Sequence, residues 1–141
     1  TEQFLNKLKP AKTIAILRLF SVYGRESKPD RLFPRLERAL LEKNPIEIST
    51  NGGDFLRPTS VNDVVINIHK ILKESISGTF NIAGPTILNM HTIIERMGAY
   101  LGVRPVITES EALPKFLAPD NHLMENTLVA PKFEFDGNWA I

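Results

Sequence analysis

The sequence predicts an α/β fold, because apolar runs of strand length alternate with segments in which apolar residues recur at helical spacing. The strand-like runs are 13–20, 46–49 and 79–83, and the helical periods cover 31–43, 60–72 and 89–101. Apolar residues make up 43% of the 141 residues and charged residues 23%, which is typical of one globular core. We therefore expect one folded unit of the α/β class.

The strand at 13–20 is nearly continuous in apolar residues, which predicts a strand covered on both faces, as in a parallel sheet. Its parallel neighbour within the chain can only be the second buried run, 79–83. Residues 2–9 precede it with apolar side chains at helical spacing and stop at Pro10, which indicates the tail of a helix. Tyr23-Gly24 and the polar residues 25–30 predict a loop.

A helix over 31–43 has Pro34 in its first turn, where a missing amide costs little. Its expected buried side contains five residues: Leu32, Phe33, Leu36, Leu40 and Leu41. Residues 46–49 alternate with period two and predict a short strand, and 51–54 (Asn-Gly-Gly-Asp) predict a turn. Ser60 and Asp63 resemble a capping box, with Asp in place of Glu, at the start of the next helix.

The expected apolar stripe of that helix is periodic: Val61, Val64, Val65, Ile68, Ile71 and Leu72. A helix from the cap Asn89 to Leu101 should stop at Gly102, and 103–108 should be a strand. Beyond Glu109 we expect short helical pieces broken by three prolines: Pro114, Pro119 and Pro131.

Composition excludes several kinds of protein. Lys and Arg total 17 against 16 Asp and Glu, so no basic field exists to hold a nucleic acid. The absence of cysteine removes disulfides, thiolate metal sites and cysteine nucleophiles. No apolar stretch reaches the ~18 residues of a membrane span, and we expect a cytoplasmic protein. Because the chain begins at Thr1 rather than at a methionine, we also expect it to be part of a longer polypeptide.

The histidines do not predict a metal site. His69, His91 and His122 lack the spacing of metal ligands, and His69 fits a helix flank, His91 a first helical turn and His122 a loop. The sequence also contains no G-x-G-x-x-G motif, no P-loop and no Tyr-x-x-x-Lys pair. We therefore find no self-contained catalytic arrangement in these residues.

Two features do favour ligand binding. Ser21 and Tyr23 follow a buried strand, and in open α/β sheets ligands bind beyond the carboxyl ends of strands. Arg57 lies just before a helix start, where a guanidinium and helix amides suit a phosphate. The alternative for Arg57, which the residues alone favour, is a surface ion pair with Asp54 or Asp63.

Four blocks in order resemble a known family. Residues 16–24 (ILRLFSVYG) resemble a strand and loop written LRxxNVYG, and 32–48 resemble the helix and strand that follow it. Residues 57–64 (RPTSVNDV) resemble R…hVdDv, and 78–84 (GTFNIAG), with the helix ending at Gly102, resemble G.vyNig…lG. Over about 1–102 the chain resembles the carboxyl-terminal half of extended short-chain dehydrogenases/reductases, the NAD-dependent epimerase/dehydratase family acting on nucleotide sugars.

This resemblance implies a partial Rossmann-like parallel sheet plus the small substrate-binding domain of such an enzyme. Residues 1–20 would end the Rossmann domain and 21–141 would form the substrate-binding region, with 61–84 packing back on the sheet. The family's dinucleotide-binding glycines and Tyr-x-x-x-Lys pair lie upstream of the LRxxNVYG block. No catalytic residue is therefore expected in this chain, and NAD or NADP would be bound mainly by the preceding half.

The resemblance also assigns site residues. Leu19 and Phe20 would lie beside the nicotinamide, and Ser21 would replace an asparagine that contacts substrate, with Tyr23 nearby in the same block. The other substrate-binding positions would be Phe33 and Pro34 at the nucleotide pocket, Glu47 and Ile48 beside the base, and Arg57 on the diphosphate. Asp63 and Asn81 match positions that are mainly structural.

The implied function is the substrate-binding part of an NAD(P)-dependent nucleotide-sugar epimerase, dehydratase or reductase, inactive by itself. The implied partner is a nucleotide-diphosphate sugar, with no nucleic acid or membrane, and a homodimer is possible. Two alternatives stay open. One is a non-catalytic scaffold or cofactor-binding subunit of the same superfamily, and the other is an independent small binding module.

Overall fold

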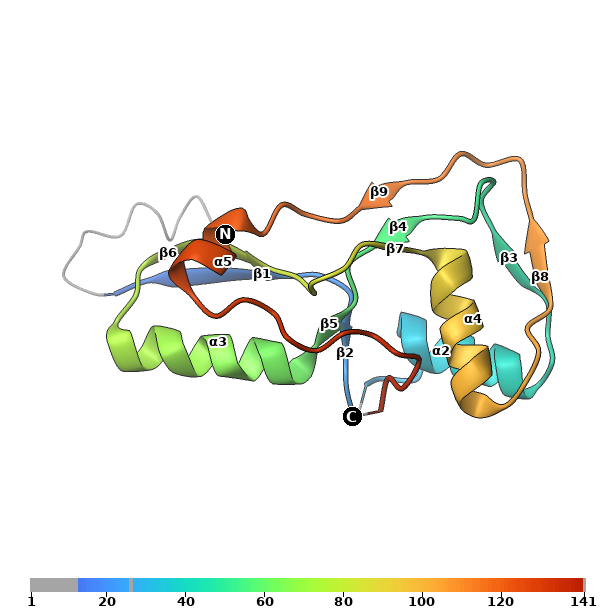
Figure 1. The fold of residues 1–141 in the computed structure, drawn as a ribbon, viewed down its shortest axis with the longest axis horizontal. Coiled ribbons are helices and arrows are strands. Elements are labelled where there is room, and N and C mark those ends of the chain that lie inside the picture. Colours follow the sequence, from blue (N-terminus) through green and yellow to red (C-terminus); the bar gives the residue numbers. More distant parts are fainter. Residues whose placement is uncertain (1–12, 26, 141) are drawn as a thin grey trace.

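The computed structural model describes residues 13–25 and 27–140. The helix expected at 2–9 lies outside these residues. Figure 1 shows an elongated molecule with two lobes. The first lobe contains β1, α3, β6 and α5, and the second contains α2, α4 and the short strands β3, β4, β7, β8 and β9. Among the described residues, no helix is long and apolar enough to cross a membrane.

The first lobe is built on a parallel strand pair. Strand β1 (Ala15–Leu19) pairs in parallel with β6 (Gly78–Ile82), which confirms the pairing expected from the sequence. Helix α3 (Val61–Glu74) runs beneath the pair, and α5 (His122–Thr127) contacts β6. The buried side chains of this lobe are Val64, Ile71, Phe80, Ile82, Met124 and Leu128.

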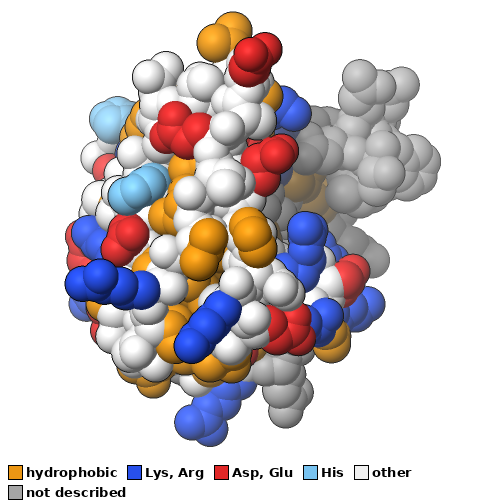
Figure 2. All heavy atoms as spheres, turned by 90° about the vertical axis from the view of Figure 1, so that its right-hand side faces the viewer, with side chains coloured by type: hydrophobic (Ala, Val, Ile, Leu, Met, Phe, Trp, Pro, Cys, Tyr) orange, Lys and Arg blue, Asp and Glu red, His pale blue; other side chains and the backbone are white. Residues whose placement is uncertain are grey.

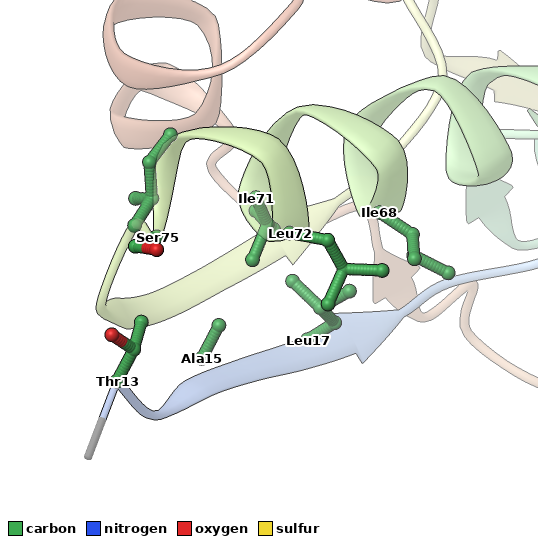
Figure 3. Close-up of a pocket in the computed structure, with 8 residues that line it drawn as sticks. Thr13, Ala15, Leu17, Ile68, Ile71, Leu72 and Ser75 are labelled. Atoms are coloured by element: carbon green, nitrogen blue, oxygen red, sulfur yellow. The ribbon is translucent and has the colours of Figure 1, made fainter.

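Within the described residues this lobe is open on one side, contrary to the expectation of a strand covered on both faces. Leu19 at the end of β1 is 51% exposed, and Leu72 on α3 is 75% exposed. Two further apolar residues of α3, Val65 and Ile68, are also exposed. The physical reason is that the described neighbours of β1 are one strand and one helix, which leave its second edge unpaired. An apolar groove of about 470 Å³ runs between β1 and the end of α3 (Figure 3).

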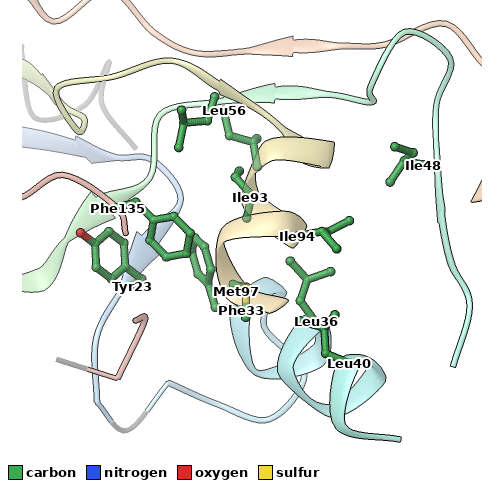
Figure 4. Close-up of a cluster of buried hydrophobic side chains, with 11 residues drawn as sticks. Tyr23, Phe33, Leu36, Leu40, Ile48, Leu56, Ile93, Ile94, Met97 and Phe135 are labelled. Atoms are coloured by element: carbon green, nitrogen blue, oxygen red, sulfur yellow. The ribbon is translucent and has the colours of Figure 1, made fainter. Parts of the chain in front are cut away.

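The second lobe has a closed core between two helices. Helix α2 (Leu32–Leu41) contacts α4 (Met90–Leu101), and β3 (Ile46–Ile48) pairs in parallel with β8 (Ile107–Glu109). Strand β4 (Phe55–Leu56) lies between antiparallel β7 (Leu88–Asn89) and parallel β9 (Phe116–Leu117). Figure 4 shows side chains of α2 and α4 that face one another in this core. The buried residues of the cluster are Tyr23, Phe33, Leu36, Leu40, Ile48, Leu56, Leu88, Ile93, Ile94, Met97 and Phe135.

The lobes meet at a short parallel pair, β2 (Val22–Tyr23) with β5 (Thr59–Ser60). Each of these strands is part of a chain segment that passes between the two lobes. Strand β2 follows β1 by two residues, and β5 leads into α3 without a break. The junction therefore lies at the carboxyl end of β1, where the sequence predicts ligand binding.

The helix ends confirm most of the sequence signals. The Asn89 side chain accepts the Thr92 N–H at 2.9 Å and begins α4, and Gly102 ends the helix with φ 68°. Ser60 caps α3 by accepting the Asn62 N–H at 3.1 Å. Leu41 is an exception to the expected buried side of α2, because it is 56% exposed at the helix's last residue.

The second half of the expected capping box is wrong. The Asp63 carboxylate accepts the backbone N–H groups of Lys132 and Phe133, at 3.0 and 3.2 Å. Asn67, one turn later, bonds both the N–H and the C=O of Val129. Two buried polar side chains of α3 thus fix the carboxyl-terminal segment rather than their own helix terminus.

That segment also differs from the expected series of helical pieces. Its first regular element is strand β9, and helix α5 follows. His122, which was expected in a loop, is the first residue of that helix. Residues 103–106 are not strand, and β8 begins at Ile107. Strand β9 forms because its backbone completes the sheet beside β4, a partner 61 residues earlier in the chain (Phe55 pairs with Phe116).

Candidate functional site

A cavity of about 540 Å³ opens at the carboxyl end of β1. It is lined by Leu19, Ser21, Val22, Ser27, Lys28, Arg31, Leu32 and Phe33. Three of the residues predicted from the sequence, Leu19, Ser21 and Phe33, therefore come together on one cavity. Its position agrees with the rule that ligands of open α/β sheets bind beyond the carboxyl ends of strands.

Ser21 has an unusual backbone at the entrance to this cavity. Its φ is +44°, a left-handed conformation that few residues other than Gly and Asn adopt readily. The conformation is held because the Ser21 carbonyl accepts the Thr59 N–H at 3.1 Å. It turns the chain sharply out of β1 and leads the next residues along the cavity wall. Such strained positions are common at ligand sites.

Thr59 organises the strand ends behind the cavity. Its buried hydroxyl oxygen lies 2.6 Å from the carbonyl of Phe20 and accepts the Gly84 N–H at 3.0 Å. Because Phe20 follows β1 and Gly84 follows β6, one side chain joins the ends of both parallel strands. Gly84 has no room for a side chain, since a Cβ there would lie 1.8 Å from the Pro58 carbonyl.

The polar wall of the cavity is cationic. Lys28 and Arg31 line it, and none of the described lining residues is acidic. Arg31 precedes the first residue of α2, whose first turn also contains no acidic residue. The charged residues that line this wall therefore favour an anion.

Tyr23 lies behind the cavity and not on its wall. Its side chain is 1% exposed, and its ring packs edge-on against Phe33 and Phe135 with centroid separations of 5.6 and 5.1 Å. The hydroxyl donates to the Phe133 carbonyl at 3.4 Å. Burial, and secondarily the negative charge of Asp63, raise the pKa of Tyr23 to about 12. Tyr23 thus anchors the carboxyl-terminal segment next to the candidate site.

Arg57 forms neither of the two surface ion pairs considered from the sequence. Its guanidinium Nη1 donates to the Asn121 side-chain oxygen and lies 3.5 Å from the Gly84 carbonyl. The Asp54 carboxylate instead accepts hydrogen bonds from the Ser49 hydroxyl and the Lys115 N–H. The Asp63 carboxylate accepts hydrogen bonds from the carboxyl-terminal segment. The Nε of Arg57 is buried and has no hydrogen-bond partner among the described residues.

The other predicted residues are spread around α2 and β3. Pro34 is buried in the first turn of α2, and Phe20 is half-buried just after β1. Glu47 is exposed and lines a groove of about 440 Å³ between α2 and β3, while Ile48 is buried in the core of the second lobe. The structure therefore does not gather all nine predicted residues around one cavity.

The described residues offer no metal-binding cluster, because no three His, Asp or Glu side chains gather among them. His69 and His91 are exposed on helices, as their positions in the sequence predicted. Figure 2 shows the end of the molecule formed by the second lobe, where cationic, anionic and hydrophobic side chains are interspersed. No field of a single sign dominates that face.

Sequence reasoning missed three residues. Lys28 and Arg31 line the cavity, and Asn121 holds Arg57. A signal for the first two existed, since both cations lie in the loop between the buried strand and the next helix. Asn121 had no signal, because its partner is 64 residues away in the chain.

Comparison with known proteins agrees with this architecture. No family model matches the chain. A UDP-glucose epimerase of Bacillus subtilis, itself uncharacterised, is 34% identical over 87 residues, covering 58% of this chain and 28% of the relative. The UDP-glucuronic acid 4-epimerase of Bacillus cereus superposes with a TM-score of 0.75 and 25% identity, over 89% of this chain and 42% of its own.

The chain is similar to the carboxyl-terminal half of the extended short-chain dehydrogenases/reductases. A dTDP-glucose 4,6-dehydratase of Bacillus anthracis, solved with NAD, shares the fold at a TM-score of 0.72 and 21% identity. The chain spans less than half the length of each of these proteins. The resemblance found in the four sequence blocks therefore extends to the fold of this half of an extended short-chain dehydrogenase/reductase.

Proposed function

We propose that the chain is the substrate-binding portion of an NAD(P)-dependent nucleotide-sugar epimerase, dehydratase or reductase. The observation that carries the proposal is the cavity at the carboxyl end of β1, which combines apolar Leu19 with a polar, cationic wall. A nucleotide sugar needs both kinds of surface, because it joins a flat nucleobase and a sugar through a charged diphosphate. The solved 4-epimerase of similar fold was crystallised with NAD and a UDP-sugar derivative.

The open first lobe supports a division into two domains. We propose that residues 1–20 end a dinucleotide-binding domain, that 21–141 form the substrate-binding region, and that 61–84 pack back on the sheet. Among the described residues the second edge of β1 has no partner strand, and Leu72 of α3 is exposed. Both observations support this division, since a preceding strand and helix would cover both. Burying such apolar surface stabilises a protein by roughly 25 cal/mol per Å².

Each site residue has a proposed task. Leu19 and Phe20 would pack beside a nicotinamide, for which the half-exposed, apolar end of β1 is suited. Ser21 would face the sugar, and Phe33 would close the nucleotide side of the same cavity. NAD, when bound, would supply the hydride acceptor. The residues of this chain would hold the sugar carbon beside it and limit access of water.

The remaining predicted positions fit supporting tasks. Tyr23 would position the cavity wall through Phe33 rather than touch the ligand. Pro34 and Ile48 would shape the nucleotide side from the core, and Glu47 would accept donors of the base at the exposed groove. Arg57 would contact the diphosphate with its guanidinium, which Asn121 holds in place.

The test is binding of UDP-glucose to the purified full-length protein and to Arg57→Ala, measured by calorimetry with NAD present. A charge-assisted contact contributes about 1.5–3 kcal/mol, so the variant should bind at least about tenfold more weakly. Arg104→Ala, which removes an exposed cation outside the cavity, is the matched control. Unchanged binding by a folded Arg57→Ala protein would refute the assigned role.

A second candidate is a non-catalytic scaffold of the same superfamily. It is favoured by the contacts of Arg57, whose Nη1 is already engaged within the chain by Asn121 and the Gly84 carbonyl. Turnover of a UDP-sugar by the full-length protein in the presence of NAD would exclude the scaffold. Binding of NAD without sugar binding or turnover would favour it.

A further inference from the structure

One wall of the candidate cavity is supported by the carboxyl-terminal segment. Phe33 lines the cavity at the start of α2, and its ring packs on that of Phe135, with centroids 5.2 Å apart. The Tyr23 ring contacts both of them, so the three rings form a closed triangle. Tyr23 and Phe135 are buried and do not belong to the residues that line the cavity. A ring on the cavity wall thus rests on a ring from a distant part of the chain.

The backbone around Phe135 is held in place from both lobes. Asp63 on α3, itself 2% exposed, accepts the Phe133 N–H at 3.2 Å. Arg96 on α4 donates from Nη1 to the Phe135 carbonyl. Two residues later, Gly137 lies so close to α4 that a Cβ there would be 2.2 Å from the Arg96 carbonyl. These contacts leave Phe135 little freedom to move, so its ring is a fixed support for its neighbours.

Loss of this support would change the shape of the cavity. Protein interiors are packed without large voids, and the space left by a large-to-small substitution is partly filled by movement of its neighbours. Phe33 is the neighbour of Phe135 that also borders the ligand cavity. Movement of its ring toward the vacated space would widen the cavity at that end, and a ligand in contact with Phe33 would lose part of that contact.

We propose that Phe135 is a positioning residue of the candidate site, which sets the nucleotide end of the cavity by supporting the Phe33 ring. The inference rests on the proposed function, under which Phe33 closes the nucleotide side. It adds the carboxyl-terminal segment to the elements that determine binding. Phe135 acts on the ligand only through Phe33, because it does not line the cavity itself.

The experiment compares the full-length protein with Phe135→Ala, and calorimetry gives separate Kd values for UDP and for NAD. The matched control is Leu40→Ala. Leu40 is buried to the same extent in the same cluster, but it lies about two turns further along α2 than Phe33 (Figure 4). Both substitutions remove a buried apolar side chain, so both should lower stability. Thermal melting identifies a temperature at which every variant is folded.

The expected result is a loss of UDP binding in one variant only. Phe135→Ala should bind UDP at least about tenfold more weakly, because the cavity wall is displaced. Its Kd for NAD should stay within about twofold, and Leu40→Ala should keep both Kd values within about twofold, because distant sites act independently. Phe135→Leu leaves a smaller space and should bind UDP about fourfold more weakly. This milder variant provides the test if Phe135→Ala does not fold.

Three outcomes overturn the inference, and they are distinguishable. Unchanged UDP binding by a folded Phe135 variant would show that Phe33 does not depend on this support, while the proposed function would stand. Equal losses of UDP binding in Phe135→Ala and Leu40→Ala would show that the effect follows from general destabilisation. Failure of the unaltered protein to bind UDP would overturn the proposed function and this inference together.

Discussion

The two lobes differ in how completely they bury their apolar residues. In the second lobe, α2 and α4 enclose Ile93, Ile94 and Met97, and none of the three has measurable exposure. In the first lobe, α3 has the same kind of apolar period, yet Val65 and Leu72 face outward. A periodic apolar stripe in the sequence therefore identifies the helix face that can be buried. Whether that face is buried depends on the neighbouring elements.

The lobes also differ in what closes them. The second lobe receives Phe135 from the carboxyl-terminal segment, which completes an aromatic cluster with Tyr23 and Phe33. The first lobe receives Met124 and Leu128 on one side only. We therefore regard the second lobe as a core complete in itself and the first as the edge of a larger sheet.

The largest predicted effect tests the closed core. Met97→Ala should lower the free energy of unfolding by about 2–5 kcal/mol, because it leaves a cavity in a packed interior. Tyr100→Ala, on the exposed side of the same helix, should change it by about 0.5 kcal/mol or less. Urea denaturation of both variants measures the contrast. Equal losses would show that the second lobe is not packed as described.

Alkaline pH should weaken the same core through Tyr23. Its pKa is about 12 in the folded protein against 10.0 for the free side chain, so the unfolded state loses its proton first. Stability should therefore fall between pH 10 and 12, with this group contributing about 1.4 kcal/mol per pH unit. Tyr23→Phe should remove that contribution, and the measured quantity is the difference in slope between the two proteins. Parallel slopes would contradict the burial of a neutral tyrosine.

The junction between the lobes depends on the Thr59 hydroxyl. Thr59→Val keeps the shape but leaves the Gly84 N–H without its partner, which should cost about 1–3 kcal/mol. Thr108→Val, at an exposed position of β8, is the matched control. Urea denaturation measures the free energy of unfolding of both variants. A loss of stability in Thr59→Val no larger than that in the control would mean that the strand ends are not joined through this side chain.

The smallest effect concerns the backbone that leads into the cavity. Ser21→Gly should relieve the strain of a left-handed conformation and stabilise the protein by up to about 1 kcal/mol. Glycine also raises the conformational entropy of the unfolded chain, which offsets part of this gain. Asparagine, the residue at this position in the motif that residues 16–24 resemble, tolerates positive φ, so Ser21→Asn should stabilise the protein without that entropic cost. A fall in melting temperature for both variants would contradict the assigned conformation.

The sequence predicted the features that depend on nearby residues. The caps Asn89 and Gly102, the start of α3 at Ser60 and the pairing of the two buried strands all follow from local patterns. The position of the cavity agrees with the rule that ligands bind beyond the carboxyl ends of strands, which had pointed to Ser21. Leu19 and Phe33, which also line the cavity, were expected from the family resemblance alone.

The missed features depend on partners distant in the chain. Asp63 bonds amides 69 and 70 residues away, which overrides its expected role in a capping box. Arg57 bonds Asn121 rather than a nearby carboxylate for the same reason. Strand β9 has little strand character of its own and exists because β4 offers an edge. Tertiary contacts of this kind do not produce a periodic pattern in the sequence.

The most direct test of the account is amide hydrogen exchange along β1 in the full-length protein, resolved by NMR. The Gly78 N–H donates to the Ile14 carbonyl and the Phe20 N–H to the Ile82 carbonyl, so even-numbered residues of β1 point toward β6. Successive residues of a strand alternate, so the amides of Ala15, Leu17 and Leu19 point to the other edge. Amides held in a central strand exchange slowly, and those on a free edge exchange fast.

If a preceding domain completes the sheet, the odd-numbered amides of β1 should be protected as strongly as those of Ile16 and Arg18, which serve as internal controls. Protection confined to Ile16 and Arg18 would show that β1 is an edge strand in the full-length protein. That result would contradict the proposal that this chain is the substrate-binding half of a larger nucleotide-sugar enzyme.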